Sequence, residues 1–176
     1  MDLVRKKASQ IKLIIFDVDG VLTDGSLYFD NQGQEYKAFN AKDGHGMRML
    51  MDSGIKVSII TGRKSELVLH RADNLRIPRE FIFQGCADKR VAFAELCQQT
   101  GIKPEHVAYV GDDVIDLPVM SKVGLPIAVA DALDVVKQHA DWITDNPGGK
   151  GAAREVCDML LDAQGKLDDL IAGYLA

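Results

Sequence analysis

Short apolar runs without polar alternation recur along the chain, and longer segments with the apolar spacing of helices separate them. Strands that are apolar on both faces are typical of a parallel sheet covered by helices on both sides. The strands predicted in this way span residues 12–17, 56–60, 81–83, 107–110, 126–129 and 142–144. The predicted helices span about 44–53, 64–75, 88–100, 113–122, 132–139 and 150–171. We therefore expect an α/β fold, a Rossmann-like three-layer sandwich with a mostly parallel sheet, as one domain over residues 1–176.

The segment 26–39, "SLYFDNQGQEYKAF", breaks this alternation. Two short strands around a turn at 31–33 predict a β-hairpin inserted after the first strand. The apolar side chains that such a hairpin would expose belong to Leu27, Phe29, Tyr36 and Phe39. Because an isolated hairpin is only marginally stable in water, we expect this one to pack on a neighbouring subunit and to serve as an oligomerisation element.

Charge and cysteine content limit the classes of function. The formal net charge is −5, which argues against nucleic acid or an anionic membrane as the main partner but leaves room for a small anionic substrate. No apolar run approaches the roughly 20 residues that span a bilayer, and the first residues lack the apolar core of a secretory signal. The three cysteines, Cys86, Cys97 and Cys157, form no C-x-x-C pair and favour neither a disulfide framework nor a zinc site. We expect a cytoplasmic protein with reduced thiols.

Polar residues follow the predicted strands at the points where ligands bind in open α/β sheets. They are Asp17 and Asp19 after the first strand, Thr61, Gly62 and Arg63 after the second, Lys89 at the start of the helix after the third, and Asp112, Asp113 and Asp116 after the fourth.

This set of residue types suits phosphate chemistry. Asp17, Asp19 and Asp112 offer the oxygen ligands of a hard cation, hence Mg²⁺, and the lack of a His/Cys cluster argues against zinc or copper. A Mg²⁺ ion held by carboxylates and water usually completes its shell with substrate phosphate. Thr61 can donate a hydrogen bond to a phosphoryl oxygen, and Lys89 can neutralise developing charge. An aspartate beside Mg²⁺ and a lysine can attack phosphorus as a nucleophile.

The stretches "DVDGVLTDG", "IITGR", "DK" at 88–89 and "GDDVID" resemble the four ordered motifs of the haloacid dehalogenase-like phosphatases. The resemblance implies that Asp17 is the nucleophile and that Asp19 protonates the leaving alcohol and then activates water. It implies that Thr61 and Lys89 hold the phosphoryl group, and that Asp112 completes the Mg²⁺ site with Asp17 and the backbone carbonyl of Asp19.

Several residues keep two readings. Asp113 and Asp116 either lie behind the metal ligands, touching the metal at most through water, or only cap the first turn of a helix. Lys42 and Asp43, in the glycine-rich loop "AKDGHG", are expected near the site. The four histidines have no partner pattern, so structural or surface roles are expected for them.

The segments between Asp19 and Thr61 and between Lys89 and Asp112 are filled by the predicted hairpin, helices and strands, so we expect no cap domain. Longer stretches, among them "KAFNAKDGHGMRML", "VAYVGDDVIDLPVM" and "GGKGAAREVCDMLLDAQGKL", resemble a capless branch of the family that hydrolyses 3-deoxy-D-manno-octulosonate 8-phosphate. The resemblance implies a Mg²⁺-dependent homotetramer with its hairpins at the centre. It also implies that the reaction is a step in the synthesis of lipopolysaccharide precursors.

The substrate of that branch is an anionic sugar acid, so further cations are expected at the site. Arg63 and Arg71, eight residues apart on one face of a helix beginning near 63, are candidates together with Gly62, although Arg71 can also be a solvated surface residue. The turn at 148–150 offers free backbone N–H groups and Lys150 to an anion. In the tetramer that the resemblance implies, this region approaches the site of a neighbouring subunit, so Gly148, Gly149 and Lys150 are expected to touch the substrate carboxylate or phosphate there.

Other functions remain as alternatives. Within the same chemistry, the substrate can be another sugar-acid phosphate, such as a nine-carbon phosphate of the sialic-acid type. A signalling receiver domain also gathers acids at strand ends, but it has no acid/base two residues after the nucleophile. A structural subunit with an inactive site is disfavoured by the intact Asp17, Asp19, Lys89 and Asp112.

Overall fold

The computed structural model describes residues 2–176, and a six-stranded sheet forms its centre. All six strands are parallel, in the order β5 (Ile82–Phe83), β4 (Lys56–Ile60), β1 (Leu13–Phe16), β6 (Val107–Gly111), β7 (Leu125–Ala128) and β8 (Trp142–Ile143). The central strand β1 pairs with β4 on one side and β6 on the other, so that Phe16 lies between Ile59 and Val110. The three strand ends of β1, β4 and β6 therefore meet at one edge.

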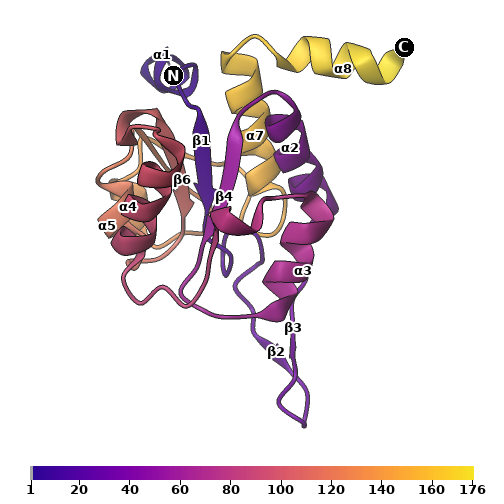
Figure 1. Ribbon diagram of the computed structural model, residues 1–176, viewed down its shortest axis with the longest axis vertical. Helices are drawn as coiled ribbons and strands as arrows, with labels where there is room; N and C mark the ends of the chain where they lie inside the picture. Colours follow the sequence, from indigo (N-terminus) through magenta and orange to yellow (C-terminus); the bar gives the residue numbers. More distant parts are fainter. Residues whose placement is uncertain (1) are drawn as a thin grey trace.

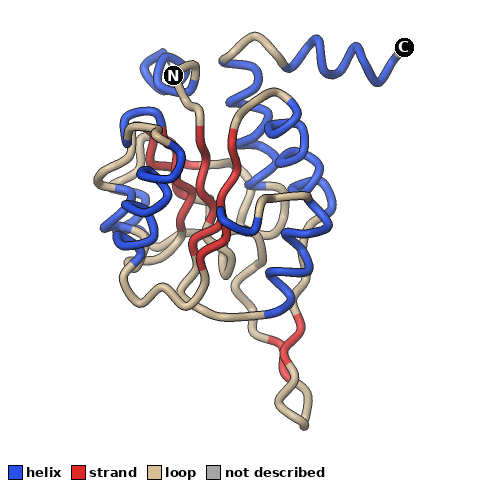
Figure 2. The backbone as a smooth tube through the Cα atoms, in the orientation of Figure 1, coloured by secondary structure: helices blue, strands red, loops and turns tan. Residues whose placement is uncertain are grey.

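Helices cover both faces of the sheet, which confirms the three-layer expectation (Figures 1 and 2). On one face lie α2 (Ala41–Asp52), α3 (Glu66–Leu75) and α7 (Ala152–Ala163), and on the other lie α4 (Lys89–Thr100) and α5 (Leu117–Met120). The remaining elements are α1 (Asp2–Ala8), α6 (Asp134–Gln138), α8 (Leu167–Leu175) and two 3₁₀ turns, Arg79–Phe81 and Pro104–His106. No helix within residues 2–176 has the length and apolar content that crossing a membrane requires.

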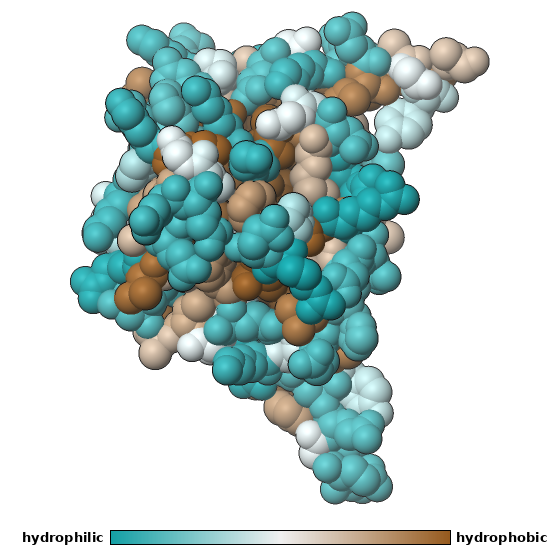
Figure 3. All heavy atoms as spheres, in the orientation of Figure 1, coloured by the Kyte–Doolittle hydropathy of each residue, from teal (hydrophilic) through white to brown (hydrophobic). Residues whose placement is uncertain are grey.

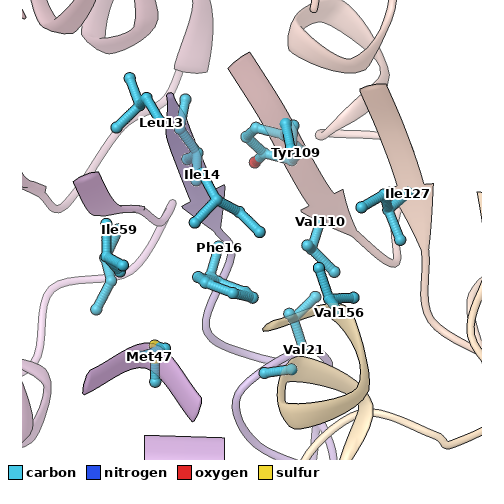
Figure 4. Packing of buried hydrophobic residues seen from close by; sticks show 14 of the residues in the cluster. Leu13, Ile14, Phe16, Val21, Met47, Ile59, Tyr109, Val110, Ile127 and Val156 are labelled. Atoms are coloured by element: carbon cyan, nitrogen blue, oxygen red, sulfur yellow. The ribbon is translucent and has the colours of Figure 1, made fainter. Parts of the chain in front are cut away.

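The core lies where the sheet meets these helices (Figure 4). Every residue of β1 and β6 is buried, as their uninterrupted apolar sequences predict. Phe16 and Ile59 contribute from the sheet, Met47 from α2 and Val156 from α7. Because both faces of β1 are fixed by this packing, the polar residues that follow Phe16 have little freedom of position.

Two predicted helices differ from the observed ones. The helix expected over 150–171 is two helices, because Gly165 adopts φ +66° and ends α7 before α8 begins at Leu167. The helix expected over 113–122 is shortened to Leu117–Met120. The Asp116 carboxylate accepts hydrogen bonds from the backbone N–H groups of Asp112 and Asp113, and this turn replaces the first helical turn.

The hairpin consists of β2 (Tyr28–Phe29) and β3 (Glu35–Tyr36), paired antiparallel and standing away from the body (Figure 3). Its residues Leu27, Tyr28, Phe29 and Tyr36 are 47%, 48%, 55% and 54% exposed. The expectation that Phe39 is also exposed is wrong. Phe39 packs against the core, and the Arg71 guanidinium lies over its ring at 5.8 Å.

The turn at 146–151 packs backbone to backbone on the loop after β1. A Cβ atom at Gly148 would lie 1.7 Å from the carbonyl oxygen of Gly20, so only glycine permits this approach. The Gly148 N–H group donates to Asp131 Oδ1, and the Gly149 N–H group donates to the Val21 carbonyl. The Lys150 N–H group donates to the Pro147 carbonyl, so the expectation of free N–H groups at 148–150 is wrong for all three residues. Gly148 and Gly149 instead fix the loop that carries Asp19.

Gly148→Ala is expected to destabilise the protein, because the added methyl group forces two backbone segments apart. We expect a loss of about 1–3 kcal/mol in the free energy of unfolding, measured by urea denaturation. Gly173→Ala is the matched control, since a Cβ atom there meets nothing within 4 Å. Equal stability of Gly148→Ala and the wild type would contradict the close approach.

Candidate active site

The carboxyl ends of β1, β4 and β6 surround one pocket of about 130 Å³. Its lining residues are Asp17, Asp19, Thr61, Gly62, Arg63, Asp112, Asp113 and Ile115. Seven of these eight were singled out from the sequence, and they come from three segments far apart in the chain. The exception is Ile115, an exposed apolar residue at the edge of the pocket.

Three acids gather at the base of this site. Asp17, Asp112 and Asp116 each place a carboxylate oxygen within 4.8 Å of the others. Burial and the neighbouring Asp116 raise the pKa of Asp17 to about 6, although Lys89 opposes the shift. Burial, Asp17 and Asp116 raise the pKa of Asp112 to about 8. Both shifts show that this cluster lacks positive charge when only the protein's own groups are present.

The hydrogen bonding of the acids shows which of them suits a cation. The buried Oδ1 atom of Asp112 has no hydrogen-bond partner among the described residues. Gly20, at φ +93°, leaves space for this carboxylate, because a Cβ atom there would lie 2.0 Å from Asp112 Oδ2. Oxygen donors of this kind fit a hard divalent cation such as Mg²⁺. Asp17 and Asp112 are therefore the carboxylates that fit this ion.

Asp116 has a different environment. Its Oδ1 accepts from Lys89 Nζ at 2.7 Å and from the Tyr109 hydroxyl at 2.6 Å. Its Oδ2 accepts from the backbone N–H groups of Asp112 and Asp113 at 3.0 and 3.2 Å. Both oxygens are thus occupied by protein donors. Asp116 holds the loop that carries Asp112, in keeping with the reading that places it behind the metal ligands, and its side chain makes no capping hydrogen bond to the helix that follows.

Lys89 lies beneath the acids with its side chain 1% exposed. Its Nζ atom is 3.0 Å from Asp17 Oδ1 and 3.2 Å from the Tyr109 hydroxyl. Burial alone would lower the pKa of Lys89, but Asp17 and Asp116 outweigh burial and raise it. The ammonium group therefore stays charged. Tyr109 was not identified from the sequence, where it reads only as a strand residue.

Asp19 points to a second group of charges. Its Oδ1 lies 2.5 Å from Lys37 Nζ, and its Oδ2 lies 3.7 Å from Arg63 Nε. Glu35 accepts from Arg63 at 2.9 Å and lies 3.2 Å from Lys37 Nζ. The sequence patterns did not identify Lys37 or Glu35 as site residues. The only available signal was the alternation at 35–37, where two charged residues flank Tyr36.

The other pocket residues take simpler positions. Thr61 is 2% exposed at the end of β4, and its backbone N–H donates to the Phe83 carbonyl. Asp113 Oδ1 accepts from the Val114 N–H group. Asp24 does not line the pocket, and its carboxylate accepts from the Ser26 N–H group in a local turn that lowers its pKa. The four histidines all lie within the described range, and none of them lines the pocket.

Four predicted residues line other hollows of the molecule, namely Arg71, Asp43, Lys150 and Lys42. Arg71 donates to the Asn40 carbonyl at 3.1 Å and borders a separate hollow with Asp43. Lys150 and Lys42 line a different shallow pocket. Because α3 begins at Glu66, Arg63 precedes the helix that carries Arg71, so the expectation of a shared helix face is wrong. Neither Arg71 nor Lys150 lines the pocket.

Comparison with known proteins bears on this site. Residues 79–156 match the model of the haloacid dehalogenase-like hydrolase family. The chain is 54% identical over 166 residues to the 3-deoxy-D-manno-octulosonate 8-phosphate phosphatase KdsC of Salmonella typhi, a match that covers 94% of this chain and 87% of that protein.

Two solved structures are similar to this chain over nearly its whole length. The Yersinia pestis 3-deoxy-D-manno-octulosonate 8-phosphate phosphatase has a TM-score of 0.93 and 51% identity, covering 95% of this chain and 89% of that one. The Moraxella catarrhalis phosphatase, solved with a magnesium ion, a phosphate ion and KDO, has a TM-score of 0.95 and 42% identity over 99% of both chains. The chain therefore belongs to the 3-deoxy-D-manno-octulosonate 8-phosphate phosphatase family of the haloacid dehalogenase-like hydrolases.

Proposed function

We propose that this protein is a Mg²⁺-dependent phosphatase that hydrolyses 3-deoxy-D-manno-octulosonate 8-phosphate to the free sugar acid and phosphate. The observation that carries the proposal is the convergence of Asp17, Asp19, Thr61 and Asp112 on one pocket, with Lys89 bonded to Asp17. The substrate is that of the relatives that share about half of the sequence. The same relatives favour it over a nine-carbon sugar-acid phosphate.

In this proposal Asp17 attacks phosphorus and the bond from phosphorus to the sugar oxygen breaks, which leaves an aspartyl-phosphate. Asp19 gives its proton to the departing oxygen, then takes a proton from the water that attacks the aspartyl-phosphate, and phosphate leaves. Mg²⁺, when bound by Asp17, the Asp19 carbonyl and Asp112, supplies positive charge beside the phosphoryl oxygens. Asp116 holds the Asp112 loop, and Asp113 lines the pocket beside it.

Cations and hydrogen-bond donors of the chain orient the substrate. Thr61 and Lys89 hold the phosphoryl oxygens. The Arg63 side chain is 44% exposed at the pocket and is placed to meet the sugar acid, beside the backbone of Gly62. Arg71 and Lys150 lie elsewhere on the subunit, so in this proposal they contact a substrate only in the pocket of a neighbouring subunit.

We propose a homotetramer whose hairpins meet at the centre. The exposed Leu27, Tyr28, Phe29 and Tyr36 support this arrangement, because apolar groups that far from the body need a covering surface. Assembly would also shelter a site that has no cap domain.

The free thiols of Cys86, Cys97 and Cys157 support a location in the reducing cytoplasm.

A substrate panel tests the proposed activity. We expect kcat/KM for 3-deoxy-D-manno-octulosonate 8-phosphate to exceed that for a nine-carbon sialic-acid-type 9-phosphate and for glucose 6-phosphate by about tenfold or more. Asp17→Asn should lower turnover at least about a thousandfold with an unchanged fold, because the nucleophile is lost. Asp168→Asn, on the exposed α8, is the matched control. Preference for the nine-carbon phosphate, or turnover by Asp17→Asn, would contradict the assignment.

Magnesium binding should depend on pH. The raised pKa values of Asp17, about 6, and Asp112, about 8, mean that the metal-free fold holds protons that the unfolded chain has lost, so it loses stability as pH rises from about 4 towards 8. Mg²⁺ needs the ionised carboxylates. At a hundredfold excess over Kd it should add about 2.7 kcal/mol, or about 5–10 °C in Tm, with a larger gain near pH 8.5 than near pH 5.5.

Thermal unfolding with Mg²⁺ or EDTA at both pH values measures this effect, and EDTA should also abolish turnover until Mg²⁺ is restored. Asp112→Asn removes one proposed ligand and should show little response to Mg²⁺. An equal gain at both pH values, or in the variant, would refute the assignment of the ion to these acids.

The hairpin surface is expected to hold the assembly together. Replacing Tyr28 and Phe29 by serine should weaken association by about a hundredfold or more, since each buried aromatic contributes roughly 1.5–3 kcal/mol. Sedimentation velocity measures the change from tetramer to smaller species. Replacing Asn31 and Gln32 at the polar tip by serine is the control. A wild type that sediments as a monomer, or a variant that stays tetrameric, would rule out this interface.

A further inference from the structure

Lys37 is a buried cation at the base of an exposed hairpin. Its side chain is 2% exposed, whereas the preceding Tyr36 is 54% exposed. A buried ammonium group needs paired counter-charges. Its Nζ atom lies 2.5 Å from Asp19 Oδ1 and 3.2 Å from Glu35 Oε1. One carboxylate of the active site and one of its own hairpin therefore fix this lysine.

Glu35 and Arg63 complete a closed ring of four charges with Asp19 and Lys37. Arg63 donates to Glu35 Oε1 at 2.9 Å, and its Nε lies 3.7 Å from Asp19 Oδ2. Burial works to raise the pKa of Glu35, but the bonds from Arg63 and Lys37 outweigh burial and lower it. Glu35 is thus an ionised anchor for both cations, and the two signs alternate around the ring.

The orientation of Asp19 depends on this ring. Within residues 2–176 its carboxylate has polar side-chain contacts with Lys37 and Arg63 and accepts no hydrogen bond from a backbone N–H group. Of the two cations, Lys37 is the buried and closer one. Arg63 is 44% exposed and more distant, and it faces the pocket where a substrate would compete for it. Lys37 is therefore the contact that can persist through a reaction.

We propose that Lys37 is a positioning residue of this active site, anchored by Glu35, and that it holds the Asp19 carboxyl group in the direction from which its proton passes to the leaving oxygen. The inference rests on the proposed phosphatase function and assigns to the hairpin a role in the chemistry. A proton donor held about 1 Å out of place loses much of its effect on rate.

The nature of the leaving group separates positioning from other roles. In the first step the Asp17 oxygen bonds to phosphorus, the phosphorus–oxygen bond to the leaving group breaks, and the Asp19 proton goes to the leaving oxygen. A sugar alcohol needs that proton, whereas p-nitrophenolate departs as a stable anion. Because kcat/KM reports only on steps up to this departure, the later work of Asp19 on water does not enter it.

Lys37→Met keeps the length of the side chain and removes its charge. We expect kcat/KM for 3-deoxy-D-manno-octulosonate 8-phosphate to fall by about thirtyfold or more, and kcat/KM for p-nitrophenyl phosphate to change by less than about threefold. Lys37→Arg restores a cation and should recover part of the loss. Glu35→Gln, which leaves Lys37 in place, should give a smaller loss of the same selective kind. Lys103→Met, at an exposed lysine, is the matched control and should match the wild type.

Thermal unfolding and sedimentation velocity are measured on each variant, so that an altered fold or assembly is recognised. A fall of equal size for both substrates would overturn the proposal, since it indicates a role in holding the phosphoryl group or the fold. Unchanged rates in both Lys37→Met and Glu35→Gln would overturn it as well. Failure of the wild type to hydrolyse the sugar-acid phosphate would remove the proposed function, and this inference with it.

Discussion

Lys89 holds together the carboxylates on which the rest of this edge of the sheet depends. Its ammonium group lies 3.0 Å from Asp17 and 2.7 Å from Asp116, and it is almost fully buried. Breaking a buried pair of this kind by removing one partner typically costs about 3–5 kcal/mol. Asp116 passes the effect on, because its second oxygen fixes the backbone of Asp112 and Asp113. One lysine from α4 thus orders residues after both β1 and β6.

This arrangement is possible because successive strands are added to opposite sides of β1 in the two halves of the chain. The strands β4 and β5 extend to one side, and β6, β7 and β8 extend to the other. Carboxyl ends that come from distant parts of the sequence then lie next to each other, which is the usual place for a ligand in such sheets. The close approach of Gly148 to Gly20 fixes the same loop from the side of α7. The packing around β1 therefore fixes the positions of the site residues that follow this strand.

Much of this was predictable from local sequence. Apolar runs located all six strands, and the residues after them supplied seven of the eight that line the pocket. The features that local sequence did not predict are of two kinds. Some depend on contacts between residues distant in sequence, and others depend on a single backbone angle. Lys37 and Tyr109 meet their partners only after folding. The break at Gly165 requires φ +66°, which glycine permits, but the presence of a glycine does not by itself predict this angle. The strand order depends on crossovers that local patterns do not encode.

The first and last helices, α1 and α8, both lie at the end of the molecule opposite the hairpin, and α8 projects sideways away from the body (Figure 1). The helices α1 and α8 are near the amino ends of the strands, while the pocket opens at the carboxyl ends. The molecule therefore has one pole that holds both termini and another that holds the chemistry. An affinity label, a fluorescent partner or an attachment to a solid surface joined to α1 or α8 would therefore begin at the end of the molecule opposite the pocket of the same chain.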